Sequence, residues 1–344
     1  MTGTNVIDHI AIPLISCCGV LGNFLNVVVF TSRIVFSEEA RRSKKWPNHS
    51  SYIRISIERS LLICLTSWAM SNFLICIMAI PKASEDANRF WFEEKNFTFY
   101  YALYSTAMLN MLSRLSVLLA TLIVLCHYCC ICWSDLAAII VHPRYLSAAT
   151  LTLFFICVLG HVPDFLTQQS HRWNNTNGTK WSTIVPKESG ASKQESKQLA
   201  YKLAWSTIGF FIPLVILCFC FVLITKQLRT CSISKSTRTK KATRRALIAA
   251  IVLALMIAIL ATPSEVLDLV DLLICDHEYS LAFRFSLSLA NLANTVQFSF
   301  NSLFCLIIDV NHRRSSIQLL RTCQRKSLGK ESETEKMRNK PTEL

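Results

Sequence analysis

Charged residues and glycines are scarce in this sequence. Asp, Glu, Lys and Arg make up 17% of the 344 residues, whereas about 25% is usual for a soluble protein. With only 8 Gly and no Gly-rich loop between a strand and a helix, a nucleotide-binding sheet is excluded. Ten-residue segments of alternating hydrophobicity are also missing, which excludes a membrane β-barrel. These absences make a helical membrane protein the first class to test.

Hydrophobic residues make up 52% of the chain and are gathered in long runs. Eight stretches of about 18 or more residues lack Asp, Glu, Lys and Arg. Arg114 alone separates the third run from the fourth, and one residue cannot reverse the chain, so these two form one long helix. We therefore predict an all-α membrane protein, a bundle of seven transmembrane helices. The runs are His9–Ser32, Ser60–Pro81, Asn96–Ser113, Leu115–Ser134, Tyr145–Pro163, Leu203–Thr225, Ala246–Ser264 and Phe285–Ile308.

Basic residues are distributed unevenly among the connections between these runs. If the amino terminus is outside, the inner segments hold 25 of the 36 Lys and Arg, and the outer segments hold 10. Cytoplasmic loops are enriched in Lys and Arg, so we predict an extracellular amino terminus and a cytoplasmic tail. The basic run 240–245 also indicates contact with anionic membrane lipids.

Acceptor sites for N-glycosylation indicate the same orientation. Sequons at Asn96, Asn174 and Asn177 fall in or beside predicted outer connections, where Asn-x-Ser/Thr can be modified. A fourth sequon, at Asn48, falls on the inner side. No cleavable signal peptide is predicted, because residues 1–8 lack basic residues and the first apolar run is long enough to span.

The predicted topology divides the chain into four parts. Residues 1–8 form the extracellular amino terminus and residues 9–310 the seven-transmembrane domain. In residues 311–326, Ile317, Leu320 and Cys323 follow at three-residue steps with arginines elsewhere. This pattern predicts a short amphipathic helix on the cytoplasmic leaflet, with Cys323 as a candidate palmitoylation site. Residues 327–344 are highly charged and are expected to form a disordered cytoplasmic tail.

Cysteines are densest in the segment Cys126-His127-Tyr128-Cys129-Cys130-Ile131-Cys132. Thiolates and an imidazole at close spacing are candidate zinc ligands. However, structural zinc sites usually join two separated ligand pairs, and cysteine in a packed helix behaves as a small hydrophobic residue. We therefore predict neither a metal nor a cofactor.

Family motifs follow one another along the predicted spans. Gly22-Asn23 is similar to the Gly-Asn pair of rhodopsin-like G-protein-coupled receptors. Asn72, followed by Pro81, stands where that family has Asp, and Cys126-His127-Tyr128 stands where it has Asp/Glu-Arg-Tyr. The chain thus resembles a divergent rhodopsin-like receptor. Further marks in the last three spans are Pro213, Pro263 and Asn301.

Two segments resemble one branch of this family, the invertebrate receptors for FMRFamide-type neuropeptides. The sequence 159–165, Leu-Gly-His-Val-Pro-Asp-Phe, is similar to their Tyr-Asn-Ile/Leu-Pro-x-Phe, and Ala261-Thr262-Pro263 is similar to their Cys-x-Thr-Pro. The resemblance implies a plasma-membrane receptor for an extracellular peptide or small-molecule ligand, acting through a heterotrimeric G protein. A nematode-type chemosensory receptor is the alternative within the same architecture.

Three positions depart from the family pattern. Asn72 replaces the carboxylate that usually binds sodium, and Cys305 replaces a switching Tyr. His127 replaces an Arg, and an imidazole with an unperturbed pKa near ~6.5 is cationic only part of the time. Coupling to the G protein is therefore expected to be altered. The family positions carried over are Asn23, Asn72 and Asn301 in the helix core, and Cys126, His127 and Tyr128 facing the G protein.

Arg114 is the one basic residue in the middle of a predicted span, about 20 Å from His127 at ~1.5 Å per residue. A charge inside the membrane needs a partner or a watery cavity. Glu265, Asp268 and Asp271 follow Pro263 on one helix face. We predict that Arg114 and these acids form a ligand pocket, in which the acidic stripe receives a cationic group. A structural ion pair between Arg114 and Glu265 is the alternative.

Other functional classes have less support. A transporter or channel needs polar residues along a continuous path and usually broken helices, and the intramembrane polar residues are too few to trace one. An enzyme needs a nucleophile–base or metal constellation, for which the cysteine cluster is the only candidate, so no enzymatic activity is predicted. The basic residues lie between apolar runs, so no nucleic-acid partner is expected.

Overall fold

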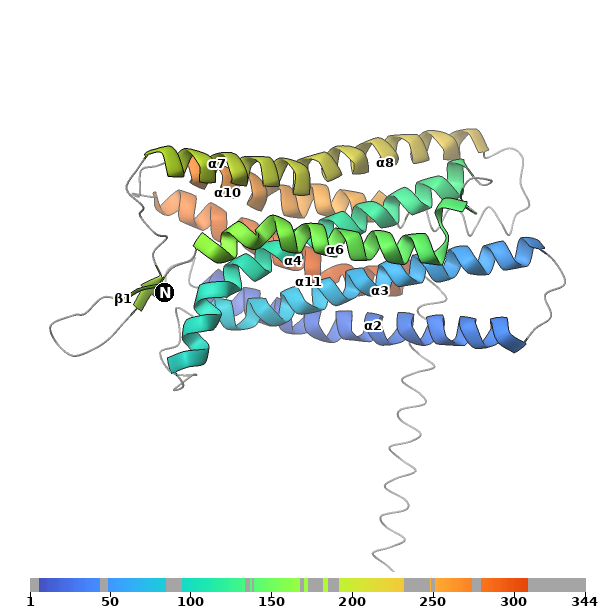
Figure 1. The fold of residues 1–344 in the computed structure, drawn as a ribbon, viewed down its shortest axis with the longest axis horizontal. Coiled ribbons are helices and arrows are strands. Elements are labelled where there is room, and N and C mark those ends of the chain that lie inside the picture. Colours follow the sequence, from blue (N-terminus) through green and yellow to red (C-terminus); the bar gives the residue numbers. More distant parts are fainter. Residues whose placement is uncertain are drawn as a thin grey trace, which may run out of the picture.

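The computed structural model describes residues 6–43, 49–84, 95–133, 137, 139–167, 170–172, 182–184, 192–231, 248, 251–273 and 280–308. In this part of the chain the long helices run side by side as one bundle (Figure 1). The strands described there are β1 (Ser170–Arg172) and β2 (Ser182–Ile184), an antiparallel pair in the connection between α6 and α7. The bundle is therefore almost entirely helical, as predicted.

The helices extend beyond the apolar runs. The 38-residue α4 confirms that the two runs flanking Arg114 form a single helix. α7 begins at Ser192, well before the apolar run Leu203–Thr225, because Lys, Gln and Glu are good helix formers outside a membrane as well. The helices are α2 (Ile12–Ser43), α3 (His49–Ser84), α4 (Lys95–Cys132), α6 (Pro143–Thr167), α7 (Ser192–Ser206), α8 (Ile212–Cys231), α10 (Thr262–Leu273) and α11 (Leu281–Ile308).

Six of the described helical segments are long and apolar enough to cross a membrane. The seventh helix, α11, has 28 residues, but Ser288, Gln297 and Ser299 are buried along it and make it more polar. α11 therefore contributes polar groups to the interior. The six segments are Ile7–Ser37, Ile55–Pro81, Tyr104–Cys130, Pro143–Phe165, Leu199–Lys226 and Ile251–Asp271.

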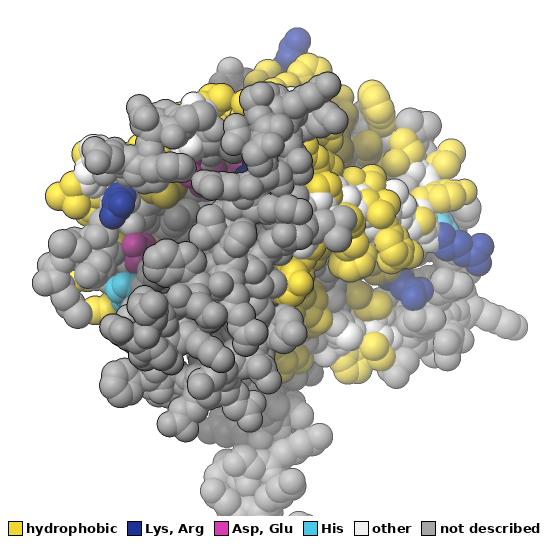
Figure 2. Space-filling view, turned by 60° about the vertical axis from the view of Figure 1, so that its left-hand side comes forward, with side chains coloured by type: hydrophobic (Ala, Val, Ile, Leu, Met, Phe, Trp, Pro, Cys, Tyr) yellow, Lys and Arg dark blue, Asp and Glu magenta, His cyan; other side chains and the backbone are white. Residues whose placement is uncertain are grey.

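Large apolar side chains cover the outside of the bundle. On α6, Phe155 and Leu159 are more than half exposed, and Val215 and Phe219 on α8 are similarly exposed. Figure 2 shows hydrophobic side chains spread along the flank of the bundle. A surface of this kind is suited to contact with lipid.

Three π-helices each end two residues before a proline. Proline has no N–H to donate to the carbonyl four residues earlier. In the wider π-helical turn, the N–H of the residue before the proline donates to the carbonyl five residues earlier. The N–H of Ile212 accordingly donates to the carbonyl of Thr207. The helices and their prolines are η1 (Ile7–Ala11) with Pro13, η2 (Thr207–Phe211) with Pro213, and η3 (Ile257–Ala261) with Pro263.

Two buried asparagines connect helices inside the bundle. The amide nitrogen of Asn23 donates to the carbonyl of Phe298 at 3.0 Å, which joins α2 to α11. The hydroxyl of Ser116 donates to Oδ1 of Asn72 at 2.6 Å and accepts from Nε1 of Trp68 at 3.0 Å, which joins α4 to α3. Polar contacts therefore set the register of these helices. The side chain of Asn301 lies outside the described residues.

Candidate functional site

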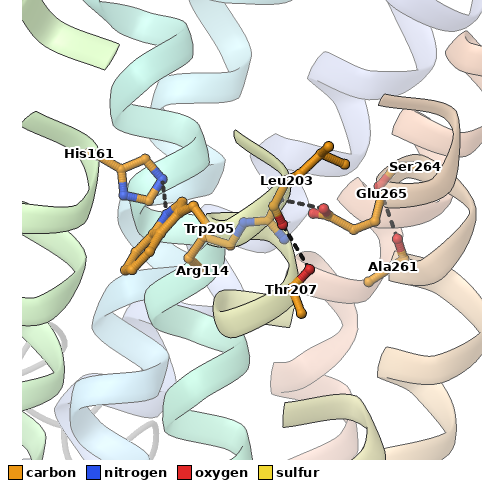
Figure 3. Close-up of polar contacts among 8 residues, drawn as sticks. All are labelled: Arg114, His161, Leu203, Trp205, Thr207, Ala261, Ser264 and Glu265. Carbon is orange, nitrogen blue, oxygen red and sulfur yellow. Dashed lines mark hydrogen bonds and ion pairs between the residues drawn. The ribbon is translucent and has the colours of Figure 1, made fainter. Parts of the chain in front are cut away.

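An ion pair joins α4 to α10 inside the bundle. Nη2 of Arg114 lies 2.5 Å from Oε2 of Glu265, and the two side chains are only 14% and 8% exposed. Figure 3 shows the guanidinium reaching from α4 toward the carboxylate. The structure thus brings together two of the four residues predicted to form a ligand pocket.

The π-helical turn η2 packs against the Arg114 side chain. A Cβ on Gly209 would lie 3.2 Å from Cδ of Arg114, so the absence of a side chain lets this backbone lie directly on the arginine stem. The guanidinium carbon lies 5.8 Å from the centre of the Phe210 ring, within the range of a cation–π attraction. η2 therefore holds Arg114 in addition to the ion pair with Glu265. Sequence reasoning missed both contacts, although a glycine within a bulky apolar run was a signal.

The ion pair leaves hydrogen-bonding groups unused. Within the described part of the chain, Nη1 of Arg114 is buried without a hydrogen-bond partner, and Oε2 of Glu265 receives no well-directed hydrogen bond despite the short contact. The hydroxyl of Ser206, one turn before Gly209, is buried and has no partner among the same residues. A buried group left unsatisfied costs about 1–3 kcal/mol. The unsatisfied groups therefore lower the stability of this part of the bundle.

A histidine–tryptophan contact fastens α6 to α7 (Figure 3). Nε1 of Trp205 donates to Nε2 of His161 at 3.1 Å, and Nδ1 of His161 lies 2.9 Å from the carbonyl of Cys157. An indole N–H can only donate, so Nε2 carries no proton and Nδ1 donates to the carbonyl. His161 is therefore neutral in this arrangement.

Gly160 permits the close approach of α7 to α6. A Cβ at this position would lie 2.3 to 2.7 Å from carbons of the Trp205 ring, closer than atoms can come. The hydroxyl of Tyr201 donates to the carbonyl of Gly160. The segment 159–165, which resembles the neuropeptide-receptor signature, thus packs α6 onto the helix that leads to η2.

Asp268 and Asp271 lie beyond Glu265, toward the end of α10. Ala261 and Glu265 are buried on one face of η3 and α10, and Asp268 continues this face at a spacing of three residues. Asp268 is nevertheless exposed, and Asp271 is partly exposed. This face of η3 and α10 is thus buried at Ala261 and Glu265 and exposed one turn later, at Asp268. The four predicted pocket residues therefore differ in burial. Arg114 and Glu265 form a buried ion pair, and Asp268 and Asp271 lie nearer the end of α10, where they are more exposed.

The other end of α4 carries the three residues predicted to face the G protein. Cys126 is buried, whereas His127 and Tyr128 are partly buried. Nδ1 of His127 lies 2.8 Å from the carbonyl of Ile123 in its own helix, and among the described residues the ring takes part in no ion pair. The Tyr128 ring packs edge-on against Trp133 at 5.7 Å. The imidazole at the family's arginine position is therefore bound to its own backbone.

The cysteine cluster packs as part of the core. Cys126 lies in the main hydrophobic core together with Cys220 of α8, and Cys129 and Cys130 pack against that core. In the part of the chain that is described, no three His, Cys, Asp or Glu side chains are arranged to hold a metal ion.

Most of the predicted modification sites fall outside the described residues. Asn96 occupies the first turn of α4, but its side chain is not described. The other predictions that lie outside the described residues are the sequons at Asn174 and Asn177, the basic run 240–245, the amphipathic helix 311–326 with Cys323, and the tail 327–344.

The comparisons with known proteins place these helices in a family. Residues 54–301, more than half of the chain, match the family described as 7 transmembrane receptor (rhodopsin family). The match begins in α3 and ends in α11, so it includes both residues of the ion pair. The comparison with curated proteins found no match. The chain therefore belongs to the rhodopsin family of seven-transmembrane receptors, which signal through G proteins.

Proposed function

We propose that this G-protein-coupled receptor responds to an extracellular neuropeptide of the FMRFamide type. The observation that carries the proposal is the arrangement on α10, where a buried carboxylate paired with Arg114 lies below two more exposed carboxylates. The similarity of the segments 159–165 and 261–263 to the neuropeptide-receptor signatures supports it. In this proposal the amino terminus is outside the plasma membrane, in agreement with the 25 basic residues of the inner segments.

Asp268 and Asp271 are the proposed partners of a cationic group on the ligand. Glu265 lies on the same helix face, but its charge is already balanced by Arg114 at 2.5 Å. The two outer carboxylates lie about 4.5 and 9 Å further along the axis of α10, at ~1.5 Å per residue. A peptide that carries an arginine can thus place it beside the exposed part of this helix face, beyond the ion pair.

A receptor assay tests this function. Cells that express the receptor with a promiscuous G-protein reporter are exposed to amidated neuropeptides and to volatile odorants. We expect activation by a cationic amidated peptide and, for Asp268→Lys, a half-maximal concentration raised at least about tenfold, which corresponds to 1.4 kcal/mol. Val266→Ala changes an exposed apolar residue of the same helix and is the matched control. A response to odorants alone favours the chemosensory alternative, and an unchanged Asp268→Lys response contradicts the acidic site.

Coupling to the G protein is proposed to involve Cys126, His127 and Tyr128. The imidazole of His127 lies 2.8 Å from the carbonyl of Ile123 in its own helix, whereas the guanidinium of an arginine is always charged and has five donors. His127→Arg is therefore expected to raise the ligand-evoked second-messenger output. Because Cys126 is buried, the variant Cys126→Asp is made only together with His127→Arg, which supplies its partner.

The matched control for this experiment is Tyr128→Phe, which keeps the ring that packs on Trp133. All variants are compared at equal surface expression. An output from His127→Arg that equals the wild-type output shows that the imidazole does not limit coupling, and it removes this part of the proposal.

A further inference from the structure

The connection between α4 and α6, residues 133–142, exposes large apolar side chains next to the first turn of α6. Large apolar side chains that are exposed together mark an interaction surface. Both the connection and the start of α6 contribute to this one, which is termed the 133–145 patch. Its members and their exposed fractions are Trp133 (52%), Ile139 (63%), Ile140 (41%) and Tyr145 (64%).

Backbone and side-chain contacts hold the patch in place. The N–H of Ala137 donates to the carbonyl of Trp133 at 2.8 Å, and the N–H of Val141 donates to the carbonyl of Ala137 at 2.9 Å. Ala137 and Val141 are buried, and the hydroxyl of Ser60 on α3 donates to the carbonyl of Val141 at 2.8 Å. The connection is thus fastened to α3 by one side, while the patch stays exposed.

We propose that the 133–145 patch inserts into the surface of the cytoplasmic leaflet, among the headgroups and upper acyl chains of anionic phospholipids. The first argument is continuity with the apolar flank of the bundle. Tyr145, Phe155 and Leu159 lie on one face of α6, and all three are more than half exposed. The patch is therefore the end of the same surface that is suited to contact with lipid.

Residue types and charge are the second argument. Trp and Tyr are enriched where a membrane meets water, because their rings are apolar and carry a polar group. Arg144 is exposed next to Tyr145, whose ring packs edge-on against His142 at 5.8 Å. The cytoplasmic leaflet is negatively charged, and an arginine stem can lie along apolar surface while its head reaches a phosphate. The patch therefore fits an anionic lipid surface.

The patch also contacts the segment proposed to face the G protein. The Trp133 ring packs against Tyr128 at 5.7 Å, and the N–H of Trp133 donates to the carbonyl of Cys129 at 2.9 Å. Insertion of Trp133 into the leaflet thus fixes the end of α4, and lipid composition acts on coupling. The inference rests on the proposed function only for the choice of leaflet, which follows from the proposed orientation.

Quenching of fluorescence by brominated phospholipids tests the proposal on the purified full-length receptor in lipid nanodiscs. Bromine is placed either near the headgroup or deep in the acyl chains of phosphatidylcholine. The contribution of Trp133 is the difference between the wild type and Trp133→Phe, which keeps an aromatic ring beside Tyr128. We expect the shallow bromine to quench this contribution at least about twofold more than the deep bromine, because the indole lies at headgroup level.

Two other results would overturn the proposal. Quenching of Trp133 by acrylamide in the water but by neither bromolipid would place the patch in the cytosol, as a surface for a protein partner. Stronger quenching by the deep bromine would place Trp133 within the hydrocarbon and not at the surface of the leaflet.

A pair of double variants assigns the insertion to the patch. Ile139→Ser/Ile140→Ser removes two apolar side chains from it, and we expect the shallow quenching of Trp133 to fall by at least about half, since insertion depends on buried apolar area. Val35→Ser/Phe36→Ser is the matched control, because both residues are exposed on α2, and it is expected to leave the quenching unchanged. An unchanged signal in the first variant, or equal falls in both, contradicts the assignment.

The preference for anionic lipid is measured in the same nanodiscs. We expect brominated phosphatidylserine to quench Trp133 more strongly than the same fraction of brominated phosphatidylcholine, with an enrichment of up to about fivefold for one basic residue near the surface. Arg144→Gln should abolish this difference. Arg284→Gln, which changes an exposed arginine of α11, should retain it. Equal quenching by both lipids in the wild type would overturn the anionic preference.

The outcome is separable from that of the proposed function, because the quenching needs neither a ligand nor a G protein. Shallow quenching of Trp133 without any peptide-evoked signal sustains the patch and counts against the neuropeptide receptor. A peptide-evoked signal from a receptor whose Trp133 is quenched only from the water sustains the receptor and overturns the patch.

Discussion

Arg114→Leu is expected to destabilise the receptor by about 3–5 kcal/mol, because it leaves the Glu265 carboxylate as an uncompensated buried charge. The carboxylate is only 8% exposed and is paired with Arg114. The result is expected as a large loss of receptor at the cell surface and as a lower melting temperature of the purified protein. Glu265→Leu is expected to act in the same direction, since the guanidinium is then left alone.

The double variant and an exposed ion pair are the controls. Replacing both members of a buried pair with apolar residues is often neutral or stabilising, so Arg114→Leu/Glu265→Leu should recover most of the loss. Arg33 and Glu58 also form an ion pair, at 2.9 Å, but Glu58 is 52% exposed. Arg33→Leu is therefore expected to cost no more than about 1 kcal/mol. Equal losses in Arg114→Leu and Arg33→Leu would show that the buried pair is not a special feature.

Gly160→Val is expected to displace Trp205 and to destabilise the α6–α7 contact. The Cβ alone would lie 2.3 Å from a ring carbon, and overpacking of this kind costs about 1–3 kcal/mol or more. Moving the indole also breaks its hydrogen bond to His161, an interaction worth about 0.5–1.5 kcal/mol. The expected readouts are a lower melting temperature and a weaker response to ligand, because α7 leads into the turn that holds Arg114.

A neighbouring substitution and a compensating one test this reason. Leu159→Ala changes a side chain that is 69% exposed and is expected to shift stability by no more than about 0.5 kcal/mol. The double variant Gly160→Ala/Trp205→Leu makes room for the new Cβ and should be more stable than Gly160→Ala alone. If Gly160→Val melts at the wild-type temperature, the close approach of the indole is not a constraint on the fold.

The membrane spans could be predicted because their signal is local. A run of apolar residues long enough to cross a bilayer indicates a helix wherever it lies in the chain, and Arg114 between two such runs predicted the continuous helix α4. The ends of the helices were harder to predict. α7 continues into a polar segment as far back as Ser192, because helix formation outside the membrane depends on intrinsic propensity and packing and not on hydrophobicity.

The candidate site could be predicted only in part. A charge inside an apolar run demands a partner, and this rule led from Arg114 to the acids of the sixth span. Nothing in the pattern indicated that Ser116 joins Asn72 to Trp68, because serines are common in membrane helices and their partners are distant in the chain. Gly209 was visible as a glycine in a bulky apolar run, but its neighbour Arg114 lies on another helix and could not be named from the sequence.

The sequence by itself determined the class of this protein: its apolar runs, its uneven basic residues and its ordered motifs specify a seven-helix receptor. These are features of single segments, and their physical cause is the transfer of each segment into lipid. Only the tertiary structure decided that Arg114 meets Glu265, that Asp268 is exposed while Glu265 is buried, and that Gly160 and Gly209 admit close neighbours. Those relations depend on how the helices rotate and approach one another, which is set by contacts between residues far apart in the chain.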